Sequence, residues 1–173
     1  MSARAPLPLR LAPQALTALR LVLAPVILEL IVAGRGAAAA ACLAMAMATD
    51  AADGPLARRY GVASRAGAWF DVWTDFIVIE AAFIGFAVTG AGPWAVPVLA
   101  ALAFALFAVT AGTTSRFHDP VGRNIGGILM VAAFAAVASR DLLVAETAFA
   151  VAIAALAVTM AGRAVFFFRL RDA

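Results

Sequence analysis

The chain has 173 residues, of which 65% are hydrophobic and 13% are charged, and its mean hydropathy is +1.01. A water-soluble domain of this length cannot bury so much apolar surface, so the composition argues against a soluble fold and places most of the chain in lipid. The net charge of +3 is carried by arginines grouped at the ends of apolar segments, which suits membrane orientation and phosphate contact and argues against nucleic-acid binding.

Residues 1–13 are predicted to form a short interfacial segment at the start of the chain. Arg4 and Arg10 alternate there with leucines, and prolines at positions 6, 8 and 13 interrupt any long helix. Residues 14–173 are predicted to form a single domain, because no link between the apolar segments is long enough for a separate soluble unit.

Six apolar segments follow, each near the length that a membrane-spanning helix needs, which is roughly 20 residues. The sequence therefore predicts an all-α, polytopic integral membrane protein with six transmembrane helices. In chain order the predicted spans are Ala15–Gly34, Ala37–Asp53, Gly67–Thr89, Pro93–Thr113, Val121–Ser139 and Leu142–Phe166. Longer polar links are expected at 54–66 and 114–120.

The arginines predict how these spans are oriented. With six spans, only Arg35 and Arg140 lie on one side of the membrane, and the other 11 of the 13 arginines lie on the opposite side. Because positive loops stay in the cytoplasm, both termini and both longer links are expected there. We therefore predict a multi-pass protein of the cell inner membrane whose active site faces the cytoplasm.

Four aspartates gather at the predicted cytoplasmic ends of the second and third spans. Asp50 and Asp53 are three residues apart, and Asp71 and Asp75 are four residues apart, so each pair shares one helix face. Two adjacent helices would thus direct four carboxylates at one point.

Carboxylates so placed repel one another and need cations, and their oxygens favour Mg²⁺ or Mn²⁺, with room for two ions. The small residues Gly54, Ala57 and Gly67 would let a diphosphate approach the helices, and Arg58 would hold a phosphate oxygen. Two alternatives stay open at this point: a set of solvated interfacial charges, and an ion or proton transporter that uses the same acids.

The residues from position 50 to position 75 follow the pattern Asp-x2-Asp-Gly-x2-Ala-Arg-x8-Gly-x3-Asp-x3-Asp. This pattern resembles the signature of the CDP-alcohol phosphotransferases, whose core has six spans. Its fixed positions are met at Asp50, Asp53, Gly54, Ala57, Arg58, Gly67, Asp71 and Asp75. The segment Leu16–Arg20 followed by Pro25 also resembles the first span of this family.

The resemblance implies a reaction, in which the hydroxyl of an acceptor alcohol displaces CMP from a CDP-linked lipid during phospholipid biosynthesis. It implies that Asp50, Asp53, Asp71 and Asp75 are metal ligands, and that Asp75 is also the general base. It further implies a homodimer and a nucleotide-binding set. The CDP-binding residues are then Asp53, Gly54, Ala57, Arg58, Ser64 and Gly67.

The acceptor is expected to be glycerol 3-phosphate, with inositol phosphate, serine and phosphatidylglycerol as alternatives. Arg116 and Arg123 are candidates for binding an acceptor phosphate. Two residues depart from the pattern of family members that use glycerol 3-phosphate: Phe76 stands where a lysine usually follows the last aspartate, and Gln14 stands where the first span usually has asparagine.

Several further polar and aromatic residues are given structural roles. Glu29 and Glu80 are expected to face the bundle interior and pair there. Trp69 and Trp73 are expected to lie on a different helix face from the acids and to anchor the protein at the membrane interface. His118, the only histidine, is expected to be uninvolved.

Overall fold

The computed structural model describes the backbone of residues 7–62, 64–111, 120–139 and 141–171, and the side chains of 14–62, 64–110, 124–139 and 141–165. Within these residues the protein is all-helical, as predicted, and contains no strand. The helices are α1 (Leu7–Val32), α2 (Gly36–Arg59), α3 (Arg65–Val88), α4 (Ala95–Ala111), α5 (Pro120–Ala138) and α6 (Leu142–Arg171).

Each predicted span corresponds to one of these helices, but α2 continues beyond its predicted end. It runs through Pro55 to Arg59, and α3 already begins at Arg65, so most of the expected polar link at 54–66 is helical. A proline inside a helix removes one backbone donor and crowds the carbonyl four residues earlier, but its φ angle is helical, and α2 continues past Pro55. The helix ends at Arg59, and the chain turns away at Gly61, whose φ is +63°. The Val62 N–H closes this turn by donating to the Ala57 carbonyl at 3.0 Å.

Helix α1 also begins earlier than predicted. It starts at Leu7, so the expectation that prolines 8 and 13 interrupt the segment 1–13 is wrong for its helical part. Pro8 lies in the first turn, where a backbone N–H has no intrahelical partner to lose.

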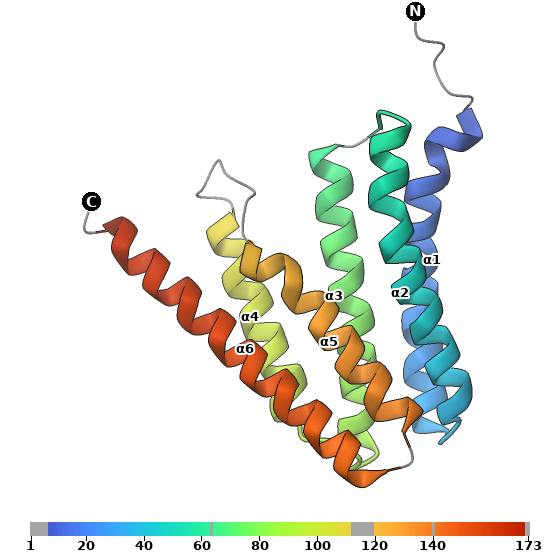
Figure 1. Cartoon of the computed structure of the whole chain (residues 1–173), viewed down its shortest axis with the longest axis vertical. Helices are drawn as coiled ribbons and strands as arrows, with labels where there is room; N and C mark the ends of the chain where they lie inside the picture. Colours follow the sequence, from blue (N-terminus) through green and yellow to red (C-terminus); the bar gives the residue numbers. More distant parts are fainter. Residues whose placement is uncertain (1–6, 63, 112–119, 140, 172–173) are drawn as a thin grey trace, which may run out of the picture.

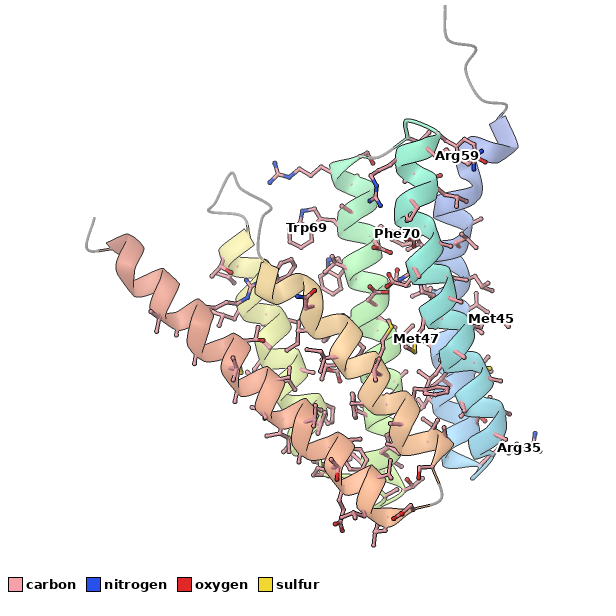
Figure 2. All side chains as sticks on the ribbon, in the orientation of Figure 1. Arg35, Met45, Met47, Arg59, Trp69 and Phe70 are labelled. Carbon is pink, nitrogen blue, oxygen red and sulfur yellow. The ribbon has the colours of Figure 1, made fainter. Side chains whose placement is uncertain are left out.

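The chain runs up and down, so that helix ends alternate between the two ends of the bundle. Helix α1 begins, α2 ends, α3 begins and α6 ends at the same end, as Figure 1 shows. Arg59 lies at this end, whereas Arg35 lies at the other (Figure 2).

Helix α1 packs along both α2 and α3, and these are the most extensive helix contacts in the described part of the bundle. Helix α5 contacts α2, α3 and α6, and α4 contacts α3 and α6. The face of α1 that is buried in these contacts repeats every three or four residues, as a helix requires. Its members are Thr17, Arg20, Ala24, Ile27 and Ile31.

Much of the outer surface is apolar. Large hydrophobic side chains such as Val22, Leu102, Val109 and Val158 are exposed on three different helices. Two stretches are long and apolar enough to cross a membrane, Gln14–Val32 and Leu142–Val165, while Ala95–Thr110 and Asn124–Ala138 are shorter apolar helices. This surface is typical of a protein in contact with lipid.

Candidate active site

The four aspartates converge on one buried cation, the guanidinium group of Arg20. Helix α2 supplies Asp50 and Asp53, α3 supplies Asp71 and Asp75, and α1 supplies Arg20. Arg20 is 0% exposed and is the largest fully buried side chain in the described residues. The predicted convergence of the acids is therefore confirmed.

The guanidinium donates a hydrogen bond to each of the four carboxylates. Its Nη1 donates to Asp50 Oδ1 at 2.9 Å and to Asp75 Oδ1, and its Nη2 donates to Asp53 Oδ2 and Asp71 Oδ1. A guanidinium has two hydrogens on each terminal nitrogen, so these four contacts use all four terminal donors. One positive charge faces four carboxylates, which leaves three negative charges in excess when all are ionised.

Helix α1 was absent from the sequence-based picture of this site, which placed the acids on two adjacent helices. In the structure α1 lies against both acid-bearing helices, which contact each other far less than either contacts α1. The hydroxyl of Thr17, one turn before Arg20, donates to Asp53 Oδ2 at 3.3 Å. The sequence signal that could have found both residues is their spacing with Ala24 and Ile27, which places them on one face of α1.

The side chains of the four acids differ in exposure. The Asp53 side chain is only 7% exposed, whereas the side chains of Asp50, Asp71 and Asp75 are 39%, 32% and 23% exposed. The cluster is therefore closed on the side of Arg20 and Asp53 and accessible on the side of the other three.

Three of the acids suit a divalent ion. Asp50, Asp53 and Asp71 each offer a carboxylate oxygen, and these atoms all lie within 4.8 Å of one another. An all-oxygen donor set with excess negative charge matches the preference of Mg²⁺ and Mn²⁺. Asp75 does not belong to this trio, but its carboxylate pairs with the same guanidinium group, that of Arg20.

A comparison with known protein families matches residues 10–162 to the CDP-alcohol phosphatidyltransferase model. The chain belongs to the CDP-alcohol phosphatidyltransferase family. The match covers most of the chain and includes the whole acidic cluster, as the resemblance of residues 50–75 indicated.

Two curated relatives from strains of Mycobacterium tuberculosis (CDC 1551 / Oshkosh and H37Rv) each carry the name "Probable phosphatidylglycerophosphate synthase". Each is 43% identical to this chain over 90 residues, which is 49% of this chain and 43% of the relative. The match thus spans less than half the length of these relatives.

The nucleotide-binding set that the CDP-alcohol phosphatidyltransferase resemblance implies lies beside the acids on α2 and α3. Ser64 is the N-cap of α3, and its Oγ accepts from the Gly67 N–H at 3.0 Å. A Cβ at Gly67 would lie 3.1 Å from that oxygen, whereas a Cβ at Gly54 would meet only Arg58 Nη1, at 3.5 Å. A side chain at Gly67 would therefore crowd the capping hydroxyl. Arg58 is exposed.

The two tryptophans of α3 pack against α4. The Trp69 ring lies 5.6 Å from Phe107, and the Trp73 ring lies 4.6 Å from Phe104, between ring centroids. Their prediction as residues on a face away from the acids agrees with these contacts. Arg163 of α6 lies 4.8 Å above the Phe107 ring and donates to Thr110 Oγ1 at 2.9 Å.

The two glutamates of the spans do not behave as expected. Glu29 is exposed on α1, so the expectation that it faces the bundle interior is wrong. Glu80 is half-buried, but its buried Oε1 has no hydrogen-bond partner in the described residues, so the expected pairing is not found there.

Arg116 and Arg123, the acceptor candidates, and His118 belong to the link between α4 and α5 and to the start of α5. Arg116 and His118 fall outside the described residues, and Arg123 belongs to the first turn of α5, where side chains are not described. Their roles remain predictions.

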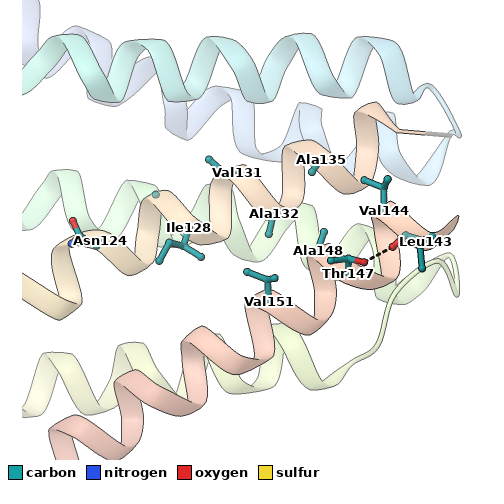
Figure 3. Close-up of a pocket in the computed structure, with 11 residues that line it drawn as sticks. Asn124, Ile128, Val131, Ala132, Ala135, Leu143, Val144, Thr147, Ala148 and Val151 are labelled. Carbon is teal, nitrogen blue, oxygen red and sulfur yellow. Dashed lines mark hydrogen bonds between the residues drawn. The ribbon is translucent and has the colours of Figure 1, made fainter. Parts of the chain in front are cut away.

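A separate groove of about 860 Å³ runs between α5 and α6 (Figure 3). Its wall is apolar, formed by residues such as Ile128, Val131, Val144 and Val151, and it includes no titratable side chain. This groove therefore offers no group for acid–base or metal chemistry, which leaves the acidic cluster as the candidate active site.

Proposed function

We propose that the protein is a phosphatidyltransferase of phospholipid biosynthesis. It would transfer a substituted phosphate group from a CDP-linked lipid, CDP-diacylglycerol, to the hydroxyl of an acceptor alcohol, with release of CMP. The observation that carries this proposal is the convergence of Asp50, Asp53, Asp71 and Asp75, within the family signature, on one cation-binding point.

Glycerol 3-phosphate is the proposed acceptor. The names of the two relatives that are 43% identical support it. Phe76 and Gln14 are the two residues at which this chain departs from the pattern of family members that use glycerol 3-phosphate. Arg116 and Arg123 are the proposed contacts for the acceptor phosphate, since guanidinium groups bind phosphate in a bidentate manner.

The chain's own residues would remove a proton from the acceptor and bind the donor. Asp75 takes the proton from the acceptor hydroxyl, whose oxygen forms a new bond to the lipid-side phosphorus as the bond from that phosphorus to the CMP oxygen breaks. Arg58, with the backbone near Gly54 and Gly67, binds the diphosphate and cytidine of the donor, and Ser64, Ala57 and Asp53 complete this set.

Divalent ions complete the proposed centre. Asp50, Asp53 and Asp71, with Asp75 adjacent, would hold Mg²⁺ or Mn²⁺ as a pair, and the ions would offset the charge of the diphosphate and of the departing CMP. The separation of at most 4.8 Å between oxygens of the first three acids supports this assignment.

The proposed setting is the cell inner membrane, with all six helices crossing it and the acidic cluster at the cytoplasmic side. The apolar outer surface and the arginines at one end of the bundle support this orientation. A homodimer is proposed from the family resemblance.

The activity is tested with purified protein in detergent and CDP-diacylglycerol. We expect CMP release that needs Mg²⁺ or Mn²⁺, stops with EDTA and resumes when the ion is restored. Offering glycerol 3-phosphate, inositol phosphate, serine and phosphatidylglycerol in parallel, and identifying the lipid by mass spectrometry, tests the acceptor. CMP release with an acceptor other than glycerol 3-phosphate would refute that assignment and retain the reaction class. Ion flux in proteoliposomes without consumption of CDP-lipid would refute both.

A further inference from the structure

The guanidinium group of Arg20 lies among the same carboxylates that the proposed function assigns to divalent ions. Each of its terminal N–H donors contacts one of the four acids, and no terminal donor remains for another partner. Its Nε has no hydrogen-bond partner in the described residues. Arg20 is therefore attached to the site through the acids alone.

The carboxylate oxygens that Arg20 uses surround a single point. Two of the bonds end on Asp53 and Asp71, which belong to the trio whose oxygens lie within 4.8 Å of one another, and a third ends on Asp50, the last member. A divalent ion that enters this trio at about 2.0–2.1 Å from its oxygens would lie close to the guanidinium and would repel it, and both cations would draw on the same negative charge. The two cations are thus alternative partners of the same acids.

We propose that Arg20 is a built-in counter-cation that competes with divalent ions for Asp50, Asp53, Asp71 and Asp75, so that metal binding displaces its guanidinium group. In the metal-free protein Arg20 limits the repulsion among the acids. The accessible sides of Asp50 and Asp71 give an incoming ion its approach. The proposal rests on the metal-binding part of the proposed function.

The competing role and a purely structural role for Arg20 predict opposite changes in metal affinity when Arg20 is removed. If the arginine only held the acids in place for the metal, its removal would let them spread apart and would weaken metal binding. If it competes, its removal takes away a rival cation and a nearby positive charge, and both changes strengthen metal binding. The sign of the change in metal affinity separates the two roles.

The test compares Arg20→Gln with the wild type in the full chain, with Mn²⁺ alone as the probe and the free ion followed by electron paramagnetic resonance. Arg35→Gln is the matched control, because it removes the same charge at the other end of the bundle, where Arg35 is exposed. We expect the Kd for Mn²⁺ to fall by about tenfold or more in Arg20→Gln, since a unit charge acts strongly on a divalent ion at contact distance. The control should keep the wild-type Kd.

A second variant and a second readout guard against misfolding. Arg20→Lys keeps the charge, but an ammonium has three donors and cannot bond four carboxylates at once. We expect its Kd for Mn²⁺ to lie between those of the wild type and Arg20→Gln. The rise in melting temperature that saturating Mn²⁺ causes should be larger in both variants than in the wild type, because their metal-free forms lack the full set of Arg20 bonds.

An unchanged or higher Kd in both Arg20 variants would overturn the competition, and the proposed function would survive. Equal melting-temperature rises in the variants and the wild type would overturn it as well. Failure of the wild type itself to bind Mn²⁺ would overturn both proposals.

Discussion

Arg20 changes how its four acidic neighbours are interpreted, because it places a buried positive charge among them. The four aspartates were found from spacing alone, because residues three or four apart share a helix face. Arg20 was grouped instead with the arginines that orient membrane proteins, since a count of positive charges does not separate a buried guanidinium from an anchoring one. Its partners are 30 to 55 residues away in the chain, and local periodicity carries no information on such contacts.

Asp75→Asn is expected to lower the rate of CMP release by about 100-fold or more, because asparagine cannot accept the proton of the acceptor hydroxyl. Binding of the CDP-lipid should be largely kept, since the side chain keeps its size and Asp50, Asp53 and Asp71 are untouched. Turnover assays and donor binding by isothermal titration measure the two effects. Asp141→Asn serves as the control. Asp141 is exposed at the start of α6, away from the cluster, and its Oδ1 accepts a hydrogen bond from the Leu143 N–H. Full turnover in Asp75→Asn would exclude the base role.

At the scale of helices, the sequence predicted which segments are helical better than where they end. The apolar runs predicted all six, since length and composition determine them. The end of α2 was missed because Gly54 and Pro55 resemble a stop signal, whereas the turn that ends the helix is made by Gly61. The contact of α1 with both α2 and α3 had no local signal, because apolar faces do not specify which helix they meet.

The N-cap of α3 gives a test at this scale. Ser64→Ala should lower the free energy of unfolding by about 0.5–2 kcal/mol, because the Gly67 N–H loses its acceptor. Ser64→Asn caps equally well and should recover stability. If the hydroxyl also contacts the CDP group, as proposed, Ser64→Asn should still raise the KM for the donor several-fold. A normal KM and normal stability in Ser64→Asn would restrict Ser64 to its capping role.

The close contact of α3 with α1 at Gly85 gives a second test at the scale of helices. A Cβ at Gly85 would lie 3.0 Å from Ile31 Cγ2 and 3.4 Å from Leu28 Cδ1. Gly85→Ala should therefore destabilise the protein by about 1–3 kcal/mol by forcing these helices apart. Gly126→Ala on α5 is the control, since a Cβ there meets nothing within 4 Å. Thermal unfolding in detergent measures both, and equal melting temperatures for the two variants would contradict the packing argument.

At the scale of the whole molecule, the alternation of the helices agrees with the number of spans that the apolar runs predicted. The ends of α2 and α6 and the starts of α1 and α3 share one end of the bundle (Figure 1). The arginine count is the basis on which we propose that this end faces the cytoplasm. The acceptor site could not be derived to the same depth, because its candidate arginines lie in and beside the link between α4 and α5, whose side chains are not described.

The orientation is tested by labelling single cysteines in intact cells. In a Cys42→Ser background, Ala66→Cys places a thiol at the start of α3, and Ala138→Cys places one at the end of α5, both at exposed positions. A membrane-impermeant maleimide should label the Ala138→Cys protein from outside and the Ala66→Cys protein only after the cells are opened. The reverse pattern would place the acids on the outer face.

The position of α1 against both α2 and α3 also matters for biosynthesis. The ribosome completes α1 first, so its arginine is already in place when the acid-bearing helices emerge. A lone carboxylate in hydrocarbon is costly, and pairing with a guanidinium that is already present lowers that cost. The chain order therefore allows each aspartate to enter the bilayer toward an existing partner, before the second half of the protein has been synthesised.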